Sequence, residues 1–144
     1  MKLNTGKVAF PIEFDNGDVQ NIYFNPNDPD LAVRMKDFRQ KVEERTKNID
    51  DLQLKPDGSP EDAEAIETIR AIQNILCEEL DAAFNSPVSA VVFKYCSPFA
   101  AVDGDFFVMQ FIEAITPEIE AHIKKSNAAV EQKMQKHVAQ YVKK

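Results

Sequence analysis

The carboxylates of Asp103 and Asp105 are the pair of side chains in this sequence that most resembles a set of metal ligands. They flank Gly104 in the stretch VDGDFF. Hard cations take about six to eight oxygen ligands, however, and the neighbouring residues do not match a calcium-binding loop. A carboxylate here is also well suited to accept hydrogen bonds from the free N–H groups at the start of a helix. We therefore predict helix capping at this position and no metal site.

The two histidines and two cysteines offer no stronger catalytic group. On one helix His122 and His137 would lie about 22 Å apart, at about 1.5 Å per residue, which is too far to share a metal. Cys77 falls in a helical pattern, where we expect it to pack, and Cys96 has only Lys94 nearby to activate its thiol. The four glycines form neither a phosphate-binding loop nor a dinucleotide fingerprint. The sequence therefore predicts a non-catalytic protein with no cofactor.

Length, composition and charge limit the class of protein. The chain has 144 residues, 44% apolar and 28% charged, which is ordinary for one globular domain. It has no apolar run near the roughly 18 residues of a membrane span, no secretory signal and no disulfide framework, so we expect a cytoplasmic location. The net charge of −7 argues against nucleic-acid binding. Residues 117–144 nevertheless carry six Lys and three Glu, a net charge of +3, which leaves −10 for residues 1–116.

Two short β-like runs, residues 7–14 and 19–24, surround Asp15-Asn16-Gly17. Because Asn-Gly favours the positive φ angles of a tight hairpin turn, these runs predict an N-terminal β-hairpin. Pro11 has no N–H to donate, so the first strand should lie at an edge. Two strands alone are marginally stable, and the hairpin should therefore pack against helices or against another copy.

An antiparallel pair of helices follows in the pattern. Asp28 as N-cap and Pro29 at the first helical position start a basic helix, and Ser59 with Pro60 start an acidic one after a loop. Each helix has an apolar stripe at helical spacing. The stripes are Leu31, Met35, Phe38, Val42 and Ile49 in the first helix, and Ile66, Ile69, Ile72, Leu76, Leu80 and Phe84 in the second. Their opposite charges should help to set the register of the pair, and burial of the stripes should supply most of the stability.

The second helix should end at a corner. Asn85 is a plausible left-handed terminator, and Ser86 with Pro87 should start a short apolar helix that closes on Phe93 and is buried. A further helix, capped by Asp103 or Asp105, should run to Ile115.

Pro117 should either kink this helix or, with Thr116 as cap, begin a new one. The sequence thus predicts a mainly α fold, a helical bundle with an N-terminal β-hairpin, in which residues 1–116 form the core domain and residues 117–144 a projecting C-terminal helix. The C-terminal helix has a sparse apolar stripe that is longer than a small domain can cover. We therefore predict that this stripe contacts a partner protein or another copy. The predicted partner-binding residues are Ile119, Ile123, Val130, Met134 and Tyr141.

The stretch LCEELDAAFNSPVSAVVF resembles a segment of the tail assembly chaperones of long-tailed bacteriophages and prophages. The matching residues are Leu80, Asp81, Phe84, Ser89, Val92 and Phe93. The stretches FNPNDPDLAVRM and FFVMQFIEAITPEIE also look like that family. Asn85 stands where the family usually has Gly, and Asn tolerates the left-handed conformation second best.

The resemblance implies a non-enzymatic, self-associating protein of the bacterial host cytoplasm. It would bind the tape-measure protein, keep it soluble and help to recruit tail-tube protein during virion assembly. An alternative from a different class is a small regulatory or adaptor protein of a mobile element, which would act stoichiometrically on a cytoplasmic target.

Overall fold

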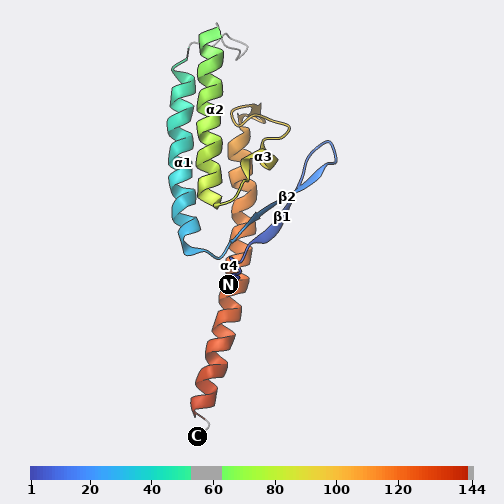
Figure 1. Ribbon diagram of the computed structural model, residues 1–144, viewed down its shortest axis with the longest axis vertical. Coiled ribbons are helices and arrows are strands. Elements are labelled where there is room, and N and C mark those ends of the chain that lie inside the picture. Colours follow the sequence, from blue (N-terminus) through green and yellow to red (C-terminus); the bar gives the residue numbers. More distant parts are fainter. Residues whose placement is uncertain (53–62, 143–144) are drawn as a thin grey trace.

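The mainly α fold, with an N-terminal hairpin and a long C-terminal helix, is confirmed. The computed structural model describes residues 1–52 and 63–142, and for 137–142 the backbone alone. The elements in chain order are β1 (Val8–Glu13), β2 (Val19–Phe24), α1 (Pro29–Asp50), α2 (Ala63–Phe84), α3 (Ser89–Val92), β3 (Ala101–Val102), β4 (Asp105–Phe106) and α4 (Phe107–Val142). Figure 1 shows α1, α2 and the first part of α4 side by side, with α4 continuing far beyond them. In the described ranges, no helix has the length and apolar character needed to cross a membrane.

The N-terminal hairpin forms as an antiparallel pair, but its turn is longer than the sequence suggested. Strand pairing ends at Glu13 and Val19. Between them the N–H of Gly17 donates to the carbonyl of Phe14 at 2.9 Å, and only Gly17, at φ 87°, has a positive φ in this turn. The buried face of the hairpin carries Phe10, Ile22 and Phe24, so the hairpin is part of the core.

Helices α1 and α2 pack side by side, and the predicted stripe of α1 is buried in full (Figure 1). In α2, Ile72, Leu76, Leu80 and Phe84 of the stripe are buried, whereas Ile66 is 40% exposed. Opposite charges meet at the rim, where the carboxylate of Glu79 lies 3.0 Å from Arg45 and 3.7 Å from Lys41. The predicted caps Ser59 and Pro60 lie outside the described residues.

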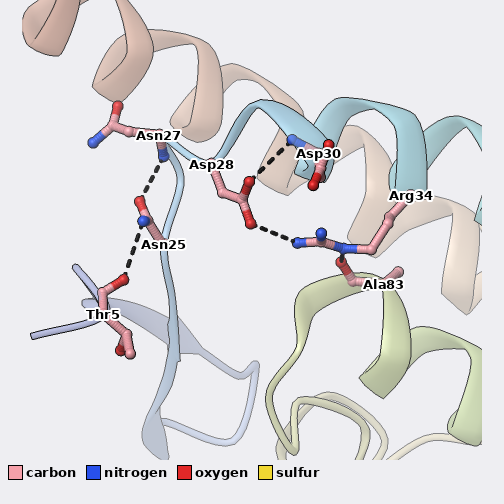
Figure 2. Close-up of polar contacts among 7 residues, drawn as sticks. All are labelled: Thr5, Asn25, Asn27, Asp28, Asp30, Arg34 and Ala83. Atoms are coloured by element: carbon pink, nitrogen blue, oxygen red, sulfur yellow. Dashed lines mark hydrogen bonds and ion pairs between the residues drawn. The ribbon is translucent and has the colours of Figure 1, made fainter. Parts of the chain in front are cut away.

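The start of α1 is tied to the end of α2 by one arginine. Asp28 caps α1, and its Oδ1 accepts a hydrogen bond from the N–H of Asp30 at 3.0 Å, as the sequence predicted. The other carboxylate oxygen of Asp28 lies 3.2 Å from the guanidinium of Arg34. Arg34 Nε in turn donates to the carbonyl of Ala83 at 2.7 Å, as Figure 2 shows. Since the last carbonyls of a helix have no partner within it, Arg34 satisfies one that α2 would otherwise leave open.

This network predicts a pH dependence. The bond from the Asp30 N–H, together with the Arg34 guanidinium, holds the pKa of the Asp28 carboxyl below its ordinary value. A lowered folded pKa means that the stabilisation is complete above the ordinary value and is lost as the pH falls through the folded value. We therefore expect Asp28→Asn to destabilise the protein near neutral pH, and this difference from the wild type to shrink at acidic pH. Urea unfolding of both proteins over a pH series measures it. Asp30→Asn is the control, and a difference for Asp28→Asn that stays constant with pH would contradict the assignment.

The corner after α2 has the predicted left-handed residue but a different start to α3. Asn85 has φ 51°, and the N–H groups of Asn85 and Ser86 donate to the carbonyls of Ala82 and Asp81, which is a Schellman ending. The prediction that Ser86 and Pro87 start the next helix was wrong, because α3 begins at Ser89. The carboxylate of Asp81 accepts from the Ser89 N–H at 2.7 Å and from its hydroxyl at 2.8 Å, so α2 itself supplies the cap.

Removing this carboxylate should loosen the corner. We expect Asp81→Ala to lower the free energy of unfolding by about 1 to 3 kcal/mol, because two partly buried donors lose their acceptor. Ser89→Ala removes only the hydroxyl and should cost less. Chemical denaturation measures both, with Glu78→Ala, on an exposed position of the same helix, as the control. Equal losses for Asp81→Ala and Glu78→Ala would show that the two bonds contribute nothing.

The segment before α4 differs from prediction, and one of the two alternatives for Pro117 is excluded. Asp103 and Asp105 do not cap α4. They lie instead on the small β3–β4 hairpin, whose turn has Asp103 at φ 51° and Gly104 at φ 83°. Helix α4 then passes through Pro117 as one helix, with no new start at Thr116. The Thr116 hydroxyl donates to the carbonyl of Ile112 at 2.7 Å within this stretch.

Candidate functional site

The C-terminal half of α4 leaves the body of the protein with apolar side chains uncovered (Figure 1). Four of the five predicted partner-binding residues have described side chains, and their exposed fraction rises along the helix. It is 9% at Ile119, 37% at Ile123, 53% at Val130 and 64% at Met134. The side chain of Tyr141 lies outside the described residues. The stripe therefore begins in the core and ends in solvent.

A groove lies where α4 leaves the body, between the N-terminal turns of α1 and the middle of α4. We call it the α1–α4 groove, and its volume is about 620 Å³. Its apolar lining joins residues predicted as core to residues predicted as partner contacts: Leu31, Met35, Ile119, Ile123 and Val130. Charges of both signs also line it: Asp28, Lys36, Arg39 and Glu120. This combination suits an amphipathic helix, whose apolar face enters the groove while its polar edges meet the rim.

Two polar contacts stabilise the walls of this groove. The capping network of Asp28 and Arg34 stabilises the first turn of α1 (Figure 2). On the other side, a guanidinium nitrogen of Arg39 donates to the Thr116 hydroxyl at 3.0 Å and so links α1 to α4. The groove is therefore built by secondary structure and by side chains that have partners.

The residues first considered for chemistry do not come together. His122 packs its ring against Phe10, with 4.9 Å between ring centroids. Burial raises the pKa of the Cys77 thiol, with the charge of Asp81 adding to the effect, and burial followed by the charge of Asp15 raises the pKa of the Cys96 thiol. Both shifts disfavour the thiolate that a nucleophile requires. Among the described residues, no three His, Cys, Asp or Glu side chains gather as a metal site would require.

The residues of the stretch 76–93 that carry the family resemblance lie mainly inside the body of the protein. Leu80, Phe84 and Val92 are buried in the core, and Asp81 binds Ser89 across the corner. They therefore shape the fold and do not line the α1–α4 groove. Residues of the other two stretches that resemble the family, such as Leu31 and Ile119, do line it.

Sequence reasoning missed the groove itself. Leu31 and Met35 were assigned to the core and the α4 stripe to a partner, and nothing in the spacing of either set shows that they share one surface. The increasing exposure along α4 could be predicted in part, because apolar residues become sparser in the sequence after Ile123. Comparison of the chain with protein-family models, with curated proteins and with solved structures gave no match.

Proposed function

We propose that this chain is a non-catalytic tail assembly chaperone of a long-tailed bacteriophage or prophage, acting in the host cytoplasm. Its clients are the tape-measure protein, which it keeps soluble, and the tail-tube protein. A client helix lies in the α1–α4 groove, and the exposed part of α4, which overlaps the groove at Ile123 and Val130, serves for self-association.

The observation that carries the proposal is the continuity of the groove with the exposed stripe of α4. Ile119, Ile123 and Val130 line the groove, and Met134 extends the same face of the helix into solvent. A helix with uncovered apolar side chains over several turns is costly for an isolated soluble protein unless a partner covers it. A tape-measure protein is expected to be long and helical, which matches an elongated apolar surface with charges of both signs at its rim.

The family assignment within this proposal is supported by the resemblance of residues 76–93. These residues form a polar corner between two helices, as the resemblance implies, and this corner is the structural support for the assignment. Asn85 has the left-handed conformation there, at the position where the family usually has Gly.

Co-expression tests the proposal. A fragment of a candidate tape-measure protein that is insoluble alone should become soluble with this chain and should co-purify with it in a fixed ratio. The control is the same fragment with an unrelated acidic helical protein of similar size. A tape-measure fragment that stays insoluble, together with no complex on mixing refolded fragment and protein, would refute the proposal.

A further inference from the structure

A second groove, on the opposite side of α4, has a different character. It lies between the N-terminal hairpin and the first turns of α4 and has a volume of about 750 Å³. Apolar side chains such as Phe10, Ile12, Phe111 and Ile115 line it. Four carboxylates also line it, from Glu13, Asp15, Asp103 and Glu118, and all four residues are exposed. Among its described lining residues there is no Lys or Arg, so we call it the acidic groove.

The exposed segment of α4, residues 123–136, has the complementary chemistry. Val130 and Met134 lie on one face with more than half of each side chain exposed. The segment carries four exposed lysines, Lys124, Lys125, Lys133 and Lys136, against the single carboxylate of Glu131. By helical periodicity, Lys124 and Lys133 flank the face of Val130 and Met134, and the other two lysines lie on the far side of the helix. The segment is therefore a basic helix with an apolar stripe, and the acidic groove is an apolar floor with an acidic rim.

This segment cannot reach the acidic groove of its own chain. Glu118 at the edge of the groove and Met134 in the segment belong to one continuous helix, and they lie about 24 Å apart at about 1.5 Å per residue. The helix would have to break and reverse to bring them together. The groove side chains of α4, such as Phe111 and Ile115, also lie on a different face of the helix from Val130 and Met134. One molecule can therefore offer its own segment and receive another at the same time.

We propose that residues 123–136 of one copy dock in the acidic groove of a second copy. Opposite charges align the two surfaces, and burial of Val130 and Met134 supplies the apolar contact. The contact joins two different surfaces, so it is heterologous and repeats from copy to copy, which gives a ring or an open chain instead of a closed two-fold dimer. The inference rests on the proposed function only in that both require copies to associate.

Charge reversal tests this pairing. The groove variant is Glu13→Lys with Glu118→Lys, and the segment variant is Lys124→Glu with Lys133→Glu. We expect the wild type to associate with increasing concentration in sedimentation velocity, and each variant to associate about tenfold more weakly. All four changes on one chain should restore association, as should mixing the two variants. The control, Glu64→Lys with Glu67→Lys on exposed positions of α2, should behave as the wild type.

Several results would overturn the inference. The first is a wild type that stays monomeric at about 100 µM, because its dissociation constant would then be too high for assembly. The second is a groove variant that associates as strongly as the wild type, because the segment would then dock on another surface. Failure of the combined changes to restore association would mean that the two surfaces do not meet. A monomeric wild type that still keeps a tape-measure fragment soluble would overturn this inference and the self-association in the proposed function, and would leave its client binding intact.

Discussion

Replacing Phe24 with Ala is expected to lower the free energy of unfolding by about 3 to 5 kcal/mol. Phe24 is fully buried at the end of β2. Its ring stacks on Phe10 with centroids 4.4 Å apart and meets Phe84 edge-on at 4.7 Å, so it joins both strands of the hairpin to the end of α2. The substitution leaves a cavity at the point where these three elements meet, and both ring contacts are lost.

Tyr23→Ala is the matched control, because Tyr23 is the preceding residue and points to the opposite face of the strand with 51% of its surface exposed. We expect that change to cost less than about 1 kcal/mol. Urea unfolding followed by circular dichroism measures both. If both substitutions lowered the free energy of unfolding by similarly small amounts, the hairpin would contribute little to the stability of the helical core.

Introducing two carboxylates on the exposed stripe should abolish client binding. In Ile123→Asp with Val130→Asp, both charges would have to enter the apolar contact without partners, at a cost of several kcal/mol. We expect the soluble fraction of a co-expressed tape-measure fragment to fall by more than about tenfold. The change should leave the body folded, because Val130 lies outside the hydrophobic core and Ile123 is 37% exposed.

The control places the same two charges, with the same spacing, on the other side of the helix. Ala121→Asp with Ala128→Asp changes exposed positions that line neither groove. We expect this variant to solubilise the client as well as the wild type does. Equal losses in the two variants would mean that net charge, and not the stripe, decides binding. Thermal unfolding of both confirms that neither change acts by unfolding the protein.

Patterns local in the sequence predicted the N-terminal hairpin, the helices α1 and α2 and the cap at Asp28, but not the start of α3 or the β3–β4 hairpin. The stripe of α1 was predicted residue by residue, because a 3.6-residue period needs only the helix itself to decide which face is buried. The cap at Asp28 and the left-handed Asn85 follow from groups within a few residues of each other.

Features that depend on distant neighbours were missed. A proline in the interior of a helix costs about 3 kcal/mol, and that cost predicts either a kink or a new helix start at Pro117. The helix continues because Ile112 and Ile115 before the proline and Ile119 after it are all buried in one core. Asp-Gly is a signal for a tight hairpin turn, but we interpreted Asp103 as a helix cap. The flanking strands have only two residues each, which is too short to show the two-residue alternation of a β-strand.

The sequence by itself thus determined a helical protein with an N-terminal hairpin, an acidic body, a basic end and more apolar helix than a small core needs. The tertiary structure alone decided where the apolar surface is concentrated, because each groove takes its walls from segments far apart in the chain. Local periodicity fixes which face of an element is apolar. Which of those faces cover one another, and which are left for a partner, depends on packing between elements that no local pattern records.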